Sequence, residues 1–215
     1  MNNRRRLLLA ALVLPTLLTL TGCEVGYFIF GQGDQPAVFK IPEQSRVLVL
    51  VDKAANSPMT VSDLQSLINT MNLLLYQNKV ATQFVPAFRL TNLQRNTELY
   101  QSMGIADIAA AVRADIVIYI YLRKFSAKLI SDKQISEGYA SAIVKVVNKN
   151  GTRLWPKDAT DGYPITVKIP QALASSQSSA AVHNALIQAV AQKVALLFYS
   201  HPQSSAANAE SSANQ

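Results

Sequence analysis

The side chains that could do chemistry in this sequence are few, and their spacing does not favour catalysis. The chain contains a single cysteine, Cys23, and two histidines, His183 and His201. Two histidines that share a metal on one helix stand four residues apart, so we expect these two to be solvent-exposed or helix-capping residues. The sequence also lacks the Gly-x-Ser-x-Gly, phosphate-loop and His-Glu-x-x-His motifs. We therefore expect no enzyme activity, no metal and no cofactor.

Three carboxylates remain as candidate ligands. Asp52 directly follows an apolar run at 47–51, where α/β proteins often place ligand-binding groups, although we favour a turn residue. Asp158 and Asp161 lie in a loop with Gly162 and suggest a cation site. Two carboxylates without further oxygen ligands make a poor calcium loop, so we interpret this loop as a solvated turn.

The surroundings of Cys23 indicate export. Arg4 to Arg6 form a basic head, and an uncharged run from Leu7 to Leu20 follows, interrupted by Pro15. This layout is typical of a secretory signal. A membrane-spanning helix needs about 20 apolar residues, so the run is too short for a permanent transmembrane segment.

The end of this run, Leu20-Thr21-Gly22-Cys23, resembles the lipobox of bacterial lipoproteins. The resemblance implies that a diacylglycerol is attached to the thiol of Cys23 and that signal peptidase II cleaves just before it. The alternative is an ordinary secretory signal that ends near a cysteine. Glu24 is not the aspartate that retains enteric lipoproteins in the inner membrane. We therefore expect a lipid-anchored, periplasm-facing envelope protein, with the outer membrane favoured over the inner.

Export and lipidation limit the remaining chemistry. With Cys23 acylated, no thiol is left for a disulfide or a zinc cluster. Removal of the three signal arginines leaves 17 Lys and Arg against 13 Asp and Glu, an ordinary balance that argues against nucleic-acid binding. Close to the anchor, Tyr27, Phe28 and Phe30 could lie in the headgroup region, where aromatic rings are favoured. They could equally pack on the domain.

We divide the chain into a signal peptide (1–22), a lipidated tether (23–44), an α/β domain (45–200) and a disordered tail (201–215). The tail contains only polar and small residues, which cannot bury enough apolar area to offset the ordering entropy. The predicted strands cover 47–51, 80–85, 115–122, 139–147, 152–155 and 165–169. The predicted helices cover 60–78, 92–102, 105–113 and 180–199. This order predicts a single-domain, mixed-sheet α/β sandwich.

Two segments of this domain resemble a family of small envelope domains. In Arg113-Ala114-Asp115-Ile116-Val117-Ile118, a helix ends at an Ala-Asp pair and enters a strand; Val146 to Trp155 forms a hairpin that ends in tryptophan. The family includes the curli-secretion lipoprotein, the amino-terminal domain of the Tol translocation protein and lipoprotein activators of penicillin-binding proteins. The resemblance implies binding to, or assembly with, envelope components. Segment 123–137 looks too short and too charged for a secretion pore.

A basic patch is predicted beside the strongest strand and consists of Arg123, Lys124, Lys128 and Lys133. It could bind anionic lipid or glycan, or it could be the solvated side of a hairpin whose lysines discourage edge pairing. We expect a non-catalytic lipoprotein that binds an envelope protein near 119–122 and the 149–155 hairpin. The alternative is a homo-oligomeric scaffold or a transport-associated assembly subunit at the membrane.

Overall fold

The computed structural model describes residues 34–130, 135–169 and 178–202, which fall into two units. The smaller unit contains β1 (Asp34–Gln35) and β8 (His201–Pro202), which pair antiparallel. The larger unit spans Ala37–Tyr199 and holds the remaining helices and strands. The predicted signal, the lipobox, Tyr27, Phe28, Phe30 and the tail beyond residue 202 lie outside the described residues.

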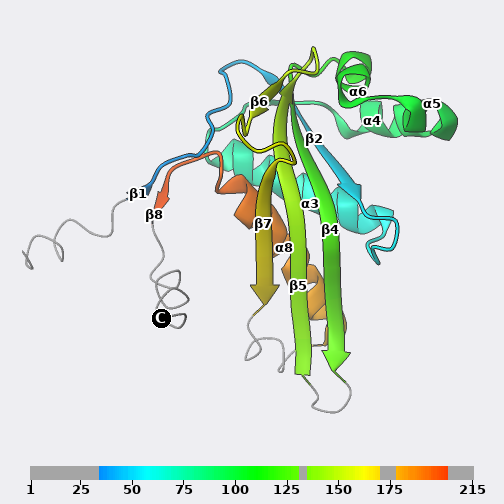
Figure 1. Ribbon diagram of the computed structural model, residues 1–215, viewed down its shortest axis with the longest axis vertical. Coiled ribbons are helices and arrows are strands. Elements are labelled where there is room, and N and C mark those ends of the chain that lie inside the picture. The colour runs from blue at the N-terminus through cyan, green and yellow to red at the C-terminus, as the bar shows by residue number, and fades with distance from the viewer. Residues whose placement is uncertain (1–33, 131–134, 170–177, 203–215) are drawn as a thin grey trace, which may run out of the picture. The chain divides into compact units, whose positions relative to one another are not determined.

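The larger unit is built on a mixed sheet, which confirms the predicted fold class (Figure 1). Its strands run in the order β3-β2-β4-β5-β6, and β7 also pairs with β5. β2 is parallel to both β3 and β4, whereas β4, β5, β6 and β7 pair antiparallel. The bounds are β2 Arg46–Lys53, β3 Gln83–Phe84, β4 Ile116–Ile130, β5 Ile135–Asn148, β6 Arg153–Trp155 and β7 Tyr163–Ile169.

Two long helices cover one face of this sheet. They are α3 (Val61–Gln77) and α8 (Ser179–Ala195), and both show the predicted helical spacing of apolar residues. Leu67 of α3 and Leu186 of α8 pack in one buried cluster with every second residue of the central strands. In β2, Val49 faces this cluster while Leu50 faces the opposite side. The apolar run at 47–51 is therefore buried on both faces, as predicted.

Three short helices, α4 (Ala87–Gln94), α5 (Thr97–Ser102) and α6 (Ile105–Val112), follow β3. α4 and α6 pack on the part of the opposite face formed by β2 and the start of β4. The predicted single helix 92–102, capped by Thr91, was wrong. α4 begins directly after Pro86, and the Thr91 hydroxyl donates back to the Ala87 carbonyl oxygen inside that helix. Asn96 caps the separate helix α5.

The hairpin of β4 and β5 is longer than the sequence indicated. The two strands pair as far as Ile130 opposite Ile135, through a bulge that leaves Arg123 without a partner. The bulge shifts the alternation by one residue, so Phe125 is buried although it follows two exposed cations. Segment 123–137 is therefore not too short for long strands, and the length argument against a secretion pore was wrong.

The domain also begins earlier than predicted. Residues 37–44 were assigned to the tether, but Ile41 is buried and Phe39 packs against the main core. The amide groups of Val38 and Phe39 both donate to the carbonyl oxygen of Leu197, over 2.8 and 3.1 Å. The burial of these apolar side chains fixes residues 37–44 on the domain. In the described ranges, no helix is long and apolar enough to cross a bilayer.

Candidate binding surface on the sheet

The part of the sheet formed by β4, β5 and β7 has a face that no described helix covers. Figure 1 shows these strands in front of α3 and α8, with α4, α5 and α6 near one end of the sheet. Alternate residues of each strand are buried against α8, and the intervening residues lie on the other side. We call this side the open face; its residues are Tyr121, Lys124, Ser126, Tyr139, Ser141, Ile143, Lys145, Pro164, Thr166 and Lys168.

Strand register places apolar and cationic side chains of the open face next to each other. One row across the strands contains Tyr121, Ile143 and Pro164. The next row contains Lys124, Ser141 and Thr166, and the row after it ends in Lys168. Because directly opposed residues have Cβ atoms about 4.5–5.5 Å apart, each row forms a continuous strip. The open face therefore combines the half-buried Tyr121 and the exposed Pro164, on either side of the buried Ile143, with neighbouring lysines.

The lysines of the open face are available for a partner. Lys124 and Lys168 are exposed, Lys145 is half-buried, and none of them forms an ion pair with another described residue. Next to them, the guanidinium of Arg123 lies 3.9 Å from the carboxylate of Asp161. Both groups of that pair are exposed, so the pair contributes little to stability. The surface carries an excess of positive charge.

A loop before β7 limits the open face on one side. Gly162, at φ 106°, is buried, and a Cβ atom there would lie 2.5 Å from Cγ2 of Ile143 and 2.8 Å from Cγ of Lys145. Only glycine allows the backbone to approach the sheet so closely. The same loop brings Asp161 to Arg123. Asp161 is an exposed turn residue, as predicted, and it also forms this ion pair.

The structure describes only part of the predicted basic patch. Arg123 and Lys124 are exposed, whereas the side chain of Lys128 and the whole of Lys133 lie outside the described residues. Sequence reasoning missed Lys145 and Lys168, which β5 and β7 bring to the face of Lys124. Both occupy outward positions in alternating strands. That pattern could have identified them if the strand pairing had been known.

The predicted surface at 119–122 is reduced to one residue, Tyr121. Ile120 and Leu122 are buried towards α3 and α8, and Tyr119 packs on the cluster beneath α4 and α6. Asp52 lies inside β2, so its assignment to a turn was wrong. Its carboxylate lies close to the Tyr119 hydroxyl.

This polar contact has a clear electrostatic consequence. Burial raises the pKa of Tyr119, and the charge and hydrogen bond of Asp52 raise it further. Burial also raises the pKa of the neighbouring Tyr100. Both phenols therefore stay neutral at physiological pH, and Asp52 serves as a hydrogen-bond acceptor in the strand.

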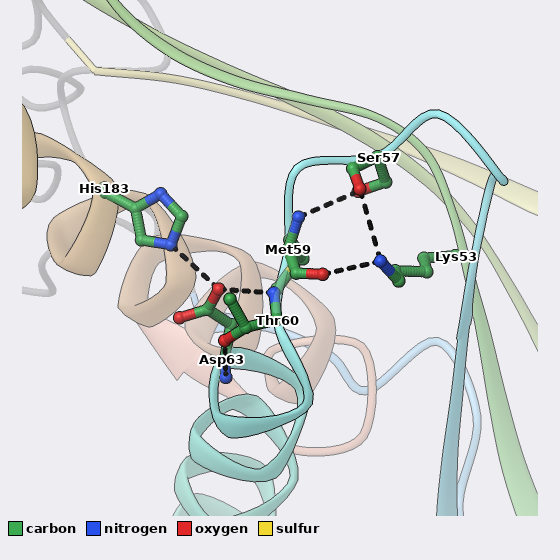
Figure 2. Close-up of polar contacts among 6 residues, drawn as sticks. All are labelled: Lys53, Ser57, Met59, Thr60, Asp63 and His183. Atoms are coloured by element: carbon green, nitrogen blue, oxygen red, sulfur yellow. Dashed lines mark hydrogen bonds and ion pairs between the residues drawn. The ribbon is translucent and has the colours of Figure 1, made fainter.

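His183 joins the beginnings of α8 and α3 (Figure 2). Its Nε2 atom lies 3.2 Å from Oδ2 of Asp63, and its ring meets the ring of Phe125 edge-on at 5.0 Å. Nearby, Nζ of Lys53 donates to the carbonyl oxygen of Met59 over 2.6 Å. His183 is half-buried and bridges two helices, so the expectation of an exposed or capping histidine was wrong. His201 lies in β8, in the other unit.

Asp63 also completes the capping box of α3. Its Oδ2 accepts from the Thr60 amide over 2.7 Å, and its own amide donates to the Thr60 hydroxyl oxygen over 3.2 Å. Burial raises the pKa of Asp63, but the hydrogen bonds from Thr60 and the contact with His183 outweigh it, so the pKa is lowered from 3.8. A carboxyl group whose pKa is lower in the folded than in the unfolded protein stabilises the fold at pH values above its unfolded pKa. This contribution is lost as the pH falls through its folded pKa.

The variant Asp63→Ala is therefore expected to unfold more easily at neutral pH, by about 1 kcal/mol, because the Thr60 amide loses its hydrogen-bond acceptor and His183 loses its partner. The difference from wild type should shrink at pH 3, because the stability that comes from a lowered pKa is lost as the pH falls below the unfolded value of 3.8. Urea unfolding at pH 7 and pH 3 measures both values. Asp158→Ala, an exposed carboxylate in a loop, is the control. A difference that stays constant with pH would contradict the assigned role of the charge.

Metal binding finds no support in this part of the chain. Across residues 34–130, 135–169 and 178–202, no group of three or more His, Cys, Asp or Glu side chains could hold a metal ion.

Comparisons with known proteins give weak likenesses. No family model and no curated protein matches the chain. Among solved structures, lipoprotein GNA1162 of Neisseria meningitidis is 18% identical with a TM-score of 0.44, over 70% of this chain and 98% of that chain. A PelC dodecamer of Paraburkholderia phytofirmans is 15% identical with a TM-score of 0.40, over 78% and 96%. The LpoB C-terminal domain of Salmonella enterica is 14% identical with a TM-score of 0.38, over 61% and 86%. Likenesses of this strength transfer no function to the chain.

Proposed function

We propose that this chain is a non-catalytic bacterial lipoprotein, anchored through Cys23, whose α/β domain binds a protein partner in the cell envelope. The domain faces the periplasm, and the outer membrane is the favoured site of the anchor because Glu24 follows the cysteine. The anchor rests on the signal and lipobox residues. The observation that carries the binding role is the open face, a sheet surface without a covering helix in the described residues.

The composition of the open face suits a protein interface. Interfaces are depleted of charge at their centre, enriched in aromatic residues and polar at their rim. Tyr121 and Pro164 supply accessible apolar area on either side of the buried Ile143, and Lys124 and Lys168 lie beside them. The uncompensated lysines favour a partner with acidic residues around an apolar spot, because opposite charges steer association and select against wrong partners.

The same charge argues against a symmetric dimer through this surface. In a two-fold contact, the same patch of both copies meets, and the lysines of the two copies would then repel each other. A two-fold homodimer would have to use another surface. The open face therefore supports a different protein as its partner.

Photo-crosslinking in cells tests the proposal. A photoreactive amino acid at Thr166, exposed on the open face, should capture a discrete partner, whereas one at Ser66, exposed on α3, should not. Lys124→Glu combined with Lys168→Glu should abolish the Thr166 product, because it reverses the charge of the rim. Lys79→Glu combined with Lys193→Glu makes the same charge change at exposed positions away from the open face and should leave the product intact.

The anchor is tested in the same cells by fractionation. Wild-type protein should sediment with membranes and carry acyl chains on Cys23 by mass spectrometry, and Cys23→Ala should lose both properties. Continued sedimentation of Cys23→Ala would overturn lipid anchoring. A product from Ser66 but none from Thr166, or a product that consists of a second copy of this chain, would overturn the proposed binding role.

A further inference from the structure

A pocket of about 340 Å³ lies where β2 and β4 begin, beside the end of α6 and the turn between β5 and β6. It is separate from the open face, whose β4 residues lie further along that strand. Its volume is at the small end of the range for ligand sites. The pocket is lined by Arg46, Ala110, Arg113, Ala114, Asp115, Lys149 and Asn150.

The charge of the pocket is predominantly positive. Three of its lining residues, Arg46, Arg113 and Lys149, are cations, and Asp115 is the one carboxylate among them. Oδ2 of Asp115 accepts from the amide of Arg46 over 3.1 Å, and Oδ1 lies 3.7 Å from Nζ of Lys149. Asp115 therefore neutralises only part of the positive charge.

The backbone of the pocket is held by hydrogen bonds between distant segments. The amide of Asp115 donates to the carbonyl oxygen of Arg46 over 2.9 Å, and the amide of Lys149 donates to the carbonyl oxygen of Asp115 over 3.0 Å. Nη1 of Arg46 donates to the carbonyl oxygen of Arg113 over 3.2 Å. Three chain segments are thus tied together without using the guanidinium of Arg113.

The backbone of Arg113 is held in a defined conformation. It ends α6 in the left-handed conformation, at φ 60°, and its amide donates to the carbonyl oxygens of Ala109 and Ala110. Its side chain is exposed, and its guanidinium makes no ion pair or hydrogen bond with any residue in the described ranges. A guanidinium offers a planar pair of donors that matches two oxygens of one phosphate group.

We propose that this pocket binds a phosphate group. Arg113 supplies paired N–H donors to two phosphate oxygens, and Lys149 supplies a second positive charge. Arg46 and Asp115 hold the wall in position. The size of the pocket suits one phosphate group with a small part of the molecule that carries it, either a soluble phosphorylated compound or a phospholipid headgroup.

Isothermal titration of the full chain in detergent, at constant ionic strength, tests this site with two probes. Inorganic phosphate represents the soluble source, and dihexanoyl phosphatidic acid below its micelle concentration represents the headgroup source. Both probes should bind. The probe with the lower dissociation constant identifies whether the pocket prefers a soluble phosphorylated compound or a phospholipid headgroup. Arg113→Gln should weaken binding by about tenfold or more, since it removes a charge-assisted pair of hydrogen bonds. Lys149→Gln should cause a smaller loss.

Arg95→Gln is the matched control, because Arg95 is an exposed arginine directly after α4 and does not line the pocket. It should leave the affinity unchanged. Arg113→Lys should restore part of the affinity, since it keeps the charge but not the paired donors. Absence of binding by both probes, equal affinity in Arg113→Gln and wild type, or an equal loss in Arg95→Gln would overturn the proposal. Thermal unfolding of each variant confirms that it is folded.

Discussion

Gly162→Ala is expected to lower the free energy of unfolding on the order of 3 kcal/mol, from two combined effects. The residue has φ 106°, a conformation that L side chains rarely adopt, so a Cβ atom there strains the backbone. The same Cβ atom would lie 2.5 Å from Cγ2 of Ile143, which is 7% exposed and cannot move aside in the centre of the sheet. The loop before β7 must then lift from the open face.

Gly151→Ala provides the matched comparison and separates the two effects. Gly151 also has a positive φ, 81°, but its nearest obstacle is Cβ of Ala106 at 3.2 Å. This variant should lose about 1 kcal/mol, mainly from backbone strain. Urea unfolding of both variants gives the difference directly. Equal losses would show that the loop does not press on Ile143. The Thr166 crosslink should also weaken in Gly162→Ala, because the loop borders that surface.

Short-range signals in the sequence predicted much of the fold. The helix at 60–78 was defined by Thr60 as its cap and by apolar residues at helical spacing, and α3 spans Val61–Gln77 between the caps Thr60 and Asn78, with the complete capping box. The run at 47–51 indicated a strand buried on both faces, as β2 is. In each case the physical cause lies within a few residues of sequence, in a cap or a repeat.

Features that depend on pairing between distant segments could not be predicted. The bulge at Arg123 continues β4 beyond the point where the charges seemed to end it. Lys145 and Lys168 join Lys124 only because two further strands have one particular register, and a shift of one residue would turn them to the other face. The phosphate pocket likewise requires Arg113 and Lys149, which are brought together by the β4 to β5 pairing and the turn that follows it.

The binding surface was harder to predict than the fold, because its residues lie far apart in the sequence. The lipobox is a continuous motif that can be recognised directly, whereas the binding surface is assembled from three strands. Sequence reasoning placed the surface at 119–122 and the 149–155 hairpin, and three of the four side chains at 119–122 are packed into the two cores. An apolar, β-branched strand predicts burial well. It does not say which of its residues remain accessible after helices cover part of each face.

Leu186→Ala is expected to cost about 2–5 kcal/mol, the range for a truncated leucine in a packed core. Leu186 is 0% exposed and belongs to the cluster that joins α8 to α3 and to the central strands. Leu73→Ala on α3 removes the same atoms from a side chain that is 54% exposed, and its effect should stay within about 0.5 kcal/mol. Urea unfolding at neutral pH measures both losses.

A comparison of Leu186→Ala with the charge reversals on the open face separates stability from binding. Leu186 lies on the side of the sheet opposite the open face, so its loss creates a cavity without changing any side chain that a partner would touch. At temperatures where Leu186→Ala is still folded, the crosslink from Thr166 should therefore persist. The charge reversals at Lys124 and Lys168 should show the opposite behaviour, with the crosslink lost and stability nearly unchanged. If Leu186→Ala abolished the crosslink while folded, binding would depend on the packing of α3 and α8, which would contradict the open face as the binding surface.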